Sequence, residues 1–188
     1  MRLYLQLCSL LAVCLWLPFA QAATQGAVGT SSAATVGITL TADLLARIDG
    51  LNDILLGAWT GAGNMIGDDD ICIGRSGVGF FAAGNYRMRL SGDGDPADVN
   101  AFTLSNGVDR IYYDVYFNDQ AGLAGRQPVV AGQMLNNQTG LGFFQILNWL
   151  FGCVVPNGNV SIVVPESQLQ GTTSGNYAGT LTLVLIPD

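Results

Sequence analysis

The chain has 188 residues, with seven Lys or Arg, fourteen Asp or Glu and no His, and its formal net charge is −7 at pH 7. This acidic balance argues against binding to nucleic acid, which needs a basic surface, and against adsorption to anionic lipid. Without His, the chain has no imidazole base and no His ligand for zinc, so His-dependent triads and His-ligated zinc sites are excluded.

Residues 1–22 are predicted to be a secretory signal peptide. Arg2 supplies an early positive charge, residues 3–17 are almost wholly apolar, and Ala20-Gln21-Ala22 has the small-x-small pattern of a cleavage site. A membrane anchor is one alternative, although the apolar run is short for a bilayer. A lipoprotein cut before Cys14 is the second. We expect an exported chain that has no membrane span after signal cleavage.

Residues 23–44 are predicted to be an N-terminal arm that ends in a strand. Residues 23–34 are small and polar and cannot build a core. The stretch "TVGITLTADLL" then alternates between apolar and polar side chains, as a half-buried strand does. Its apolar face consists of Val36, Ile38, Leu40, Ala42 and Leu44. It could be the first strand of a complete sandwich, in which case residues 23–34 would be the free arm, with Val28 as its only bulky side chain.

Residues 45–188 are predicted to form an all-β sandwich. Short apolar or alternating runs recur about every ten residues and are separated by Gly, Asn and Asp, which is typical of that architecture. We expect residues 60–70 to be a loop, and residues 85–92 to be either an edge strand or a strand with one wet face. The apolar anchors expected before these elements are Ile48, Leu51, Ile54 and Leu56, and the inward residues expected in the strands are Tyr86, Met88, Leu90, Ile111, Tyr113, Val115 and Phe117.

The segment "LGFFQILNWLFG", residues 141–152, departs from this pattern because most of its side chains are apolar. A buried strand or short helix leading to Cys153 is one interpretation, and an exposed hydrophobic loop that contacts a partner is the other. Cys153 and Cys72 are the only cysteines left after signal cleavage, so a disulfide is expected in an exported chain. Two free thiols are the alternative.

The carboxylates give little support for catalysis or metal binding. Most Asp residues stand beside Gly or Asn in turns, where their side chains bond to local backbone. The runs at residues 68–70 and 93–98 could offer oxygens to calcium, but neither has the spacing of a twelve-residue calcium loop. Hydrolysis by a pair of carboxylates also remains open. We expect no enzyme, no cofactor and no metal site.

The chain closes on "GNYAGTLTLVLIPD", where Gly175, Tyr177 and Gly179 precede an alternating apolar strand. Together with the signal, the arm and the single disulfide, this ending resembles subunits of chaperone–usher pili of the archaic or colonisation-factor type. The middle of the chain also resembles the related spore-coat-U-like secreted proteins. The resemblance implies an immunoglobulin-like (pilin-type) sandwich that lacks its last strand.

The resemblance also implies partners and roles. A periplasmic pilus chaperone would lend a strand beside the last strand, an outer-membrane usher would assist assembly, and a neighbouring pilin subunit's arm would then replace the chaperone in an extracellular fimbrium. The arm residues from Val36 to Leu44 would be the donor. The acceptor side would comprise Tyr177, Leu181, Leu183, Leu185 and Asp188. A chain of one domain favours a shaft or minor subunit over a two-domain tip.

A different class of function stays open from the sequence alone. The chain could be a secreted monomeric module that recognises glycans or surfaces through exposed aromatic residues. The candidates are Tyr112, Tyr116 and Trp149.

Overall fold

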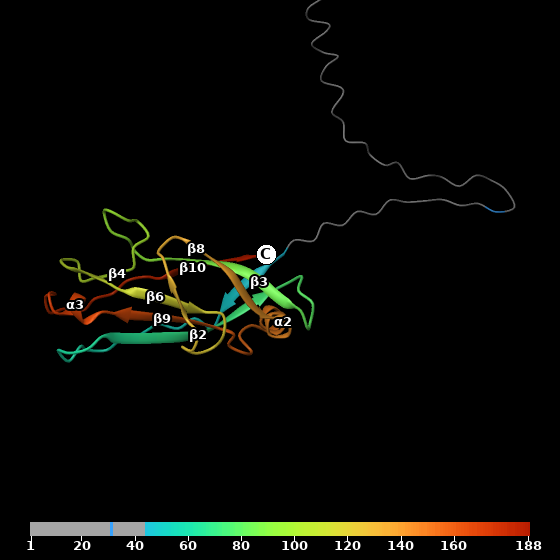
Figure 1. The fold of residues 1–188 in the computed structure, drawn as a ribbon, viewed down its shortest axis with the longest axis horizontal. Helices are drawn as coiled ribbons and strands as arrows, with labels where there is room; N and C mark the ends of the chain where they lie inside the picture. Colours follow the sequence, from blue (N-terminus) through green and yellow to red (C-terminus); the bar gives the residue numbers. More distant parts are fainter. Residues whose placement is uncertain (1–30, 32–43) are drawn as a thin grey trace, which may run out of the picture. The chain divides into compact units, whose positions relative to one another are not determined.

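The computed structural model describes residue 31 and residues 44–188, and the latter form a sandwich of antiparallel sheets (Figure 1). One sheet has five strands in the order β1 (Ala46–Asp49), β2 (Met65–Arg75), β9 (Gly158–Val164), β6 (Asp114–Asn118) and β7 (Gln127–Val129). The second has the order β10 (Thr182–Pro187), β3 (Ala83–Ser91) and β8 (Met134–Leu141). Strands β4 (Thr103–Ser105) and β5 (Arg110–Tyr112) form a separate pair.

The core lies between the two larger sheets and follows the alternation in the sequence. In β3, Tyr86, Met88 and Leu90 are at most 1% exposed, while Arg89 on the other face is exposed. Along β5 and β6 the inward residues are likewise buried: Ile111, Tyr113, Val115 and Phe117. The prediction of an all-β, immunoglobulin-like sandwich is confirmed, although β3 is the central strand of its sheet.

The prediction that residues 60–70 form a loop is wrong for the second half of that range, because β2 already begins at Met65. The physical reason is that the Asp side chains have partners along the strand. Asn159 Nδ2 donates to Asp68 Oδ2 at 2.9 Å and to Asp70 Oδ1 at 2.8 Å, and Asp69 Oδ2 accepts from the backbone N–H of Asn52 at 2.7 Å. Paired carboxylates of this kind let an acidic run continue as a strand.

Residues Gly142–Phe151 form the helix α2, which combines parts of both interpretations of this segment. It is a short helix, but its polar side chains are the buried ones: Gln145 is 0% and Asn148 1% exposed. Leu150 and Phe151, by contrast, are 60% and 72% exposed. We call α2 inverted because these polar side chains face the protein while Leu150 and Phe151 face the solvent. The polar side chains face inward because Gln145 Nε2 donates to the carbonyl of Gly84, and Asn148 is hydrogen-bonded to residues 154–157.

The disulfide between Cys72 and Cys153 is present, with a Cα–Cα distance of 5.2 Å. It joins β2 to the residue that follows the C-cap of α2, and the alternative of two free thiols is not observed. The bond therefore fastens one end of the inverted helix to the five-stranded sheet.

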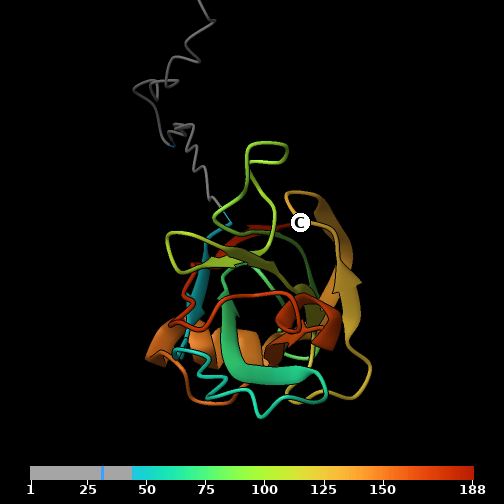
Figure 2. The same cartoon turned by 90° about the vertical axis from the view of Figure 1, so that its left-hand side faces the viewer.

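The sandwich has two distinct ends, which we call the α2 end and the α3 end (Figure 1). At the α2 end, β2 and β10 finish and β1 and β3 start; Arg75 Nη2 donates there to the carbonyl of Asp188 at 2.8 Å. At the α3 end, the short helix α3 (Glu166–Leu169) follows β9. Figure 2 views the sandwich from the α3 end. No helix in the described part of the chain is long and apolar enough to span a membrane.

Candidate strand-accepting groove

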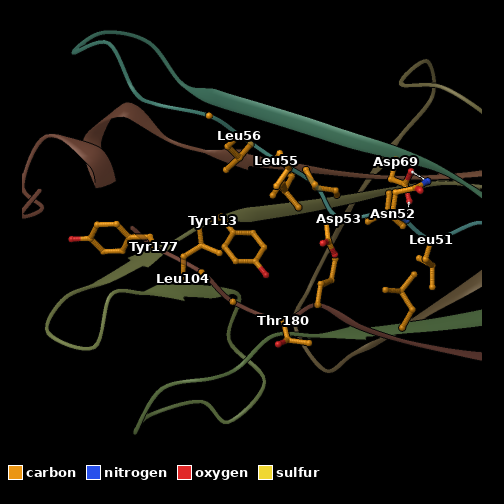
Figure 3. A pocket seen from close by; sticks show the side chains of 18 of the residues that line it. Leu51, Asn52, Asp53, Leu55, Leu56, Asp69, Leu104, Tyr113, Tyr177 and Thr180 are labelled. Carbon is orange, nitrogen blue, oxygen red and sulfur yellow. Dashed lines mark hydrogen bonds between the residues drawn. The ribbon is translucent and has the colours of Figure 1, made fainter. Parts of the chain in front are cut away.

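An apolar groove of about 980 Å³ lies between the segment 50–57 and the C-terminal segment 177–183. Its floor is formed by Leu104 of β4, Tyr113 before β6, and Val160 and Ile162 of β9. Figure 3 shows Leu55 and Leu56 on one side of it, facing Leu104, Tyr113 and Tyr177 on the other. The apolar side chains that line it are Ile48, Leu51, Ile54, Leu55, Leu56, Leu104, Tyr113, Val160, Ile162, Tyr177, Leu181 and Leu183.

The first wall, residues 50–57, begins where the chain turns away from β2. Gly50 has a φ of +76°, and a Cβ there would lie 2.6 Å from the Sγ of Cys153, so both the backbone angle and the space require glycine. Beyond it, Asn52 holds the wall to β2 through its backbone and side-chain N–H groups, which both donate to Asp69. The wall is thus attached by side chains and has no regular strand pairing of its own.

Ile54 and Leu56 turn from this wall toward the core. A Cβ at Gly67 of β2 would lie 2.5 Å from Ile54 and 3.0 Å from Leu56, so the missing side chain at Gly67 is what gives them room. Leu51 and Leu55 are 55% and 88% exposed. The expectation that Leu51 is a core anchor is therefore wrong, since it lies on the rim of the groove.

The second wall consists of residues 177–181 and the first half of β10. Ser105 and Ala178 exchange two backbone hydrogen bonds, and Thr180 N–H donates to Asp93 Oδ2 at 2.8 Å. Gly179 lies so close to β4 that a Cβ would be 2.4 Å from the carbonyl oxygen of Thr103. The Gly-x-Tyr-x-Gly pattern therefore has a packing reason at its last glycine.

Strand β10 is apolar, but it is paired on one side only and none of its side chains is fully buried. Within residues 44–188 its backbone pairs with β3 and with no other strand, so its edge beside the groove carries unpaired main-chain groups. None of its six residues is fully buried, whereas all seven residues of β9, which has neighbours on both sides, are. An open apolar edge of this kind is a template for the addition of another strand.

The structure brings together part of the predicted site. Tyr177, Leu181 and Leu183 line the groove, while Leu185 packs on the core beyond it. Asp188 is bound within the chain, since Arg87 Nε donates to its carboxylate at 2.7 Å. On the donor side, Val36, Ile38, Leu40 and Ala42 lie outside the described residues, and Leu44 is 45% exposed.

Sequence reasoning missed the first wall and the floor of the groove. Residues 50–57 have no regular alternation that would identify them as a wall, and Leu104 lies in a strand of only three residues. The sequence does place a glycine at each end of the wall, Gly50 and Gly57, and glycine often marks a change in chain direction. In the structure both glycines have positive φ angles.

The chemistry of the groove suits binding and offers little for catalysis. Asn52 and Asp69 are bonded to each other, and Thr180 is anchored through its backbone to Asp93. The other polar side chains in the lining are Asp53 and the tyrosines Tyr113 and Tyr177. Among the described residues there is no group of three His, Cys, Asp or Glu side chains that could hold a metal. An open strand edge beside an apolar groove is a geometry that can accept an extended apolar segment.

The aromatic residues considered for glycan binding come from three separate elements. The hydroxyl of Tyr112 in β5 donates to Asp95 Oδ2 at 2.6 Å, and the guanidinium carbon of Arg126 lies 4.7 Å from the ring centroid of Tyr116 in β6. Trp149 lies on α2 and is partly buried. None of the three lines the groove.

The fold and groove define an immunoglobulin-like β-sandwich whose C-terminal strand borders an open apolar groove. Among solved structures, a chain of a chaperone–tip adhesin complex, described as vital for synergistic activation of CFA/I fimbriae biogenesis, is similar with a TM-score of 0.51 and 17% identity. The similarity covers 76% of this chain and 42% of that one, and at this identity it shows a shared fold. No protein-family profile and no curated protein matches the sequence.

Proposed function

We propose that the protein is a structural subunit, in the shaft or a minor position, of an extracellular adhesive pilus, and that it assembles by donor-strand exchange. The observation that carries the proposal is the groove beside the unpaired edge of β10. In strand addition, main-chain hydrogen bonds to such an edge give affinity, and alternate side chains fill the pockets beside it.

The arm of another copy has the features of a suitable occupant. In an extended strand, every second side chain lies on the same face, about 6.7 Å further along. Val36, Ile38, Leu40, Ala42 and Leu44 would therefore place five apolar side chains along the groove, opposite Leu181 and Leu183. The proposal divides the chain into a signal peptide of residues 1–22, a donor arm of residues 23–44 and a sandwich of residues 45–188.

A subunit with an open groove needs a partner before it polymerises, because an exposed apolar edge aggregates. We therefore include a periplasmic chaperone that occupies the groove first and an outer-membrane usher where the arm of the next subunit replaces it. The similarity to a chain from a fimbrial chaperone–adhesin complex supports this choice of partner. The assembled protein would be a cell-surface fimbrium.

A pair of substitutions in the arm tests the proposal. Leu40→Asp would place a charge in the neighbour's groove, whereas Thr39→Asp would place the same charge on the opposite face of the strand. We expect the full chain carrying Leu40→Asp to stay monomeric or chaperone-bound, and the chain carrying Thr39→Asp to polymerise. The measurement is the ladder of polymers that resists SDS at room temperature and dissociates on heating.

Polymers of Leu40→Asp equal to those of the unsubstituted chain would contradict the proposal. A synthetic peptide of residues 33–44 provides the complementary measurement. Added to the Leu40→Asp chain, it should raise the melting temperature of that chain, because the groove of the variant is intact. The same peptide with Leu40 replaced by Asp is the control and should have no effect.

A further inference from the structure

A second apolar surface lies at the α2 end, away from the groove. It consists of Phe80 and Phe81 in the loop before β3, and of Leu141 and Phe143 at the start of α2; we call it the aromatic patch. Phe81 is 93% exposed, Leu141 61%, Phe80 49% and Phe143 36%. The ring centroids of Phe80 and Phe81 are 5.6 Å apart, and those of Phe80 and Phe143 are 4.8 Å apart.

The patch is held in place by its own surroundings. The backbone N–H of Gly142 donates to the carbonyl of Ala82 at 2.9 Å, and Ala82 N–H donates to Gly79 at 3.0 Å. A Cβ at Gly142 would lie 2.1 Å from the carbonyl oxygen of Gly79, so the helix and the loop are in close contact. Because α2 docks through Gln145 and Asn148, it leaves Phe143, Leu150 and Phe151 exposed.

The arm joins the sandwich at this same loop. Leu45 N–H donates to Ser76 Oγ at 2.8 Å, and Ser76 N–H donates back to the carbonyl of Leu45 at 2.9 Å. The side chain of Leu44 lies over Gly77. Residues 23–43 of the arm therefore connect to the domain at a loop position three residues before Phe80 in the sequence.

We infer that the aromatic patch is the surface on which each subunit contacts the neighbouring copy that receives its arm, an inference that rests on the function proposed above. If Leu44 is the last donor side chain, only Leu45 separates it from the start of β1. Two residue steps span at most about 7 Å. The groove of the neighbour must therefore abut the α2 end, where the aromatic patch lies.

The direction of the arm identifies which end of the neighbour faces the patch. An arm that ran parallel to β10 would leave the groove at the neighbour's α2 end, where that copy's own arm departs. A linear polymer needs these two positions apart, so the arm runs antiparallel to β10 and leaves at the α3 end. There the groove continues into a hollow of about 750 Å³ with apolar residues in its lining, among them Leu56, Trp59, Ile111 and Leu169.

A lipid surface is the other occupant that exposed phenylalanines could serve. The chain carries a formal net charge of −7, which repels anionic membranes. A second copy has the advantage that the arm fixes it beside the patch. The apolar contact would then add to the energy of strand exchange, since the burial of phenylalanine side chains is favourable.

Photo-cross-linking tests this arrangement. Benzoylphenylalanine replaces Phe81 in the full chain, with Val130 as the matched control because it is also an exposed apolar residue, 60% exposed, but follows the edge strand β7 away from the α2 end. In polymers, we expect position 81 to give cross-links between copies that map to residues 57–61 or 169–176 of the neighbour, and position 130 to give none at those residues. In addition, Phe81→Ser should make polymers dissociate roughly tenfold faster on heating, and Val130→Ser should not.

Three results would overturn the inference: cross-links from position 81 to the same copy's residues 23–43, cross-links to lipid, or polymers with no cross-link at position 81 and unchanged dissociation of Phe81→Ser. These results leave the proposed function intact, because the polymers still form and still depend on Leu40. If the unsubstituted chain forms no polymers, the proposed function fails first and the inference fails with it.

Discussion

Asn148 shows how one buried amide decides which face of a helix is exposed. Its Nδ2 donates to the carbonyl of Val155 at 2.8 Å and to Asn157 Oδ1 at 3.1 Å, and its Oδ1 accepts from the N–H groups of Val154 and Val155. Asn157 in turn bonds both the N–H and the carbonyl of Ile73 in β2. Asn148 and Asn157 together thus link α2, the 154–157 turn and the five-stranded sheet.

Asn148→Ala should lower the free energy of unfolding by about 3 kcal/mol, because it leaves several buried polar groups without partners. Leu150→Ala is the control on the same helix and should cost about 0.5 kcal/mol or less, since Leu150 is 60% exposed. Urea unfolding of the two variants measures the difference. A larger loss for Leu150→Ala would contradict the inverted docking of α2.

At the level of the elements, sequence reasoning succeeded where strands alternate strictly. The inward residues of β3, β5 and β6 could be predicted because one wet face and one dry face impose a period of two. Helix α2 could not be assigned, because an apolar run has no period that separates a strand from a helix, and its buried residues are the polar ones. The groove needed contacts between residues about 120 positions apart, which no local pattern encodes.

The disulfide is the covalent link between two of these elements, β2 and the end of α2. It closes a loop with a sequence separation of 81 residues. In the chain-entropy model, a loop of that size contributes about 4 kcal/mol to stability. The double variant Cys72→Ala/Cys153→Ala should therefore lose about that much free energy of unfolding, measured by urea titration against the oxidised chain. A loss below about 1 kcal/mol would show that the polar contacts of α2 suffice.

At the scale of the whole molecule, the titrating groups predict a broad plateau of stability against pH. Hydrogen bonds hold the pKa of three carboxyls, Asp49, Asp95 and Asp109, below the usual range. The donors are the backbone N–H of Gly50, the hydroxyl of Tyr112 and Thr173, respectively. Burial raises the pKa of the Tyr113 hydroxyl to about 12 and also raises that of Tyr86. The chain has no His, and Cys72 and Cys153 are joined in a disulfide, so no side chain of residues 44–188 has an ordinary pKa between those of the carboxyls and the tyrosines.

Stability falls at acid pH, the acid limb, and at alkaline pH, the alkaline limb. The reason in each case is whether the folded or the unfolded state binds the proton more tightly. Carboxyls with a lowered pKa in the folded state favour folding above about pH 4, and this contribution is lost as the pH falls. Tyrosines with a raised pKa favour folding below about pH 10, and this contribution is lost as the pH rises. We expect the urea midpoint to be flat from pH 5.5 to 9. Asp109→Asn should flatten the acid limb and Tyr113→Phe the alkaline limb; a slope across the middle would contradict this account.

The place where the groove wall begins also gives maturation an order in time. Gly50, the first residue of that wall, lies against Cys153, one half of the disulfide. Until the two cysteines are joined, no covalent bond holds Cys153 against the start of the wall. Under the proposed function, we therefore expect oxidation to precede capture of a strand. Such an order would confine competent subunits to an oxidising compartment and keep any reduced chain inside the cell from joining with others too early.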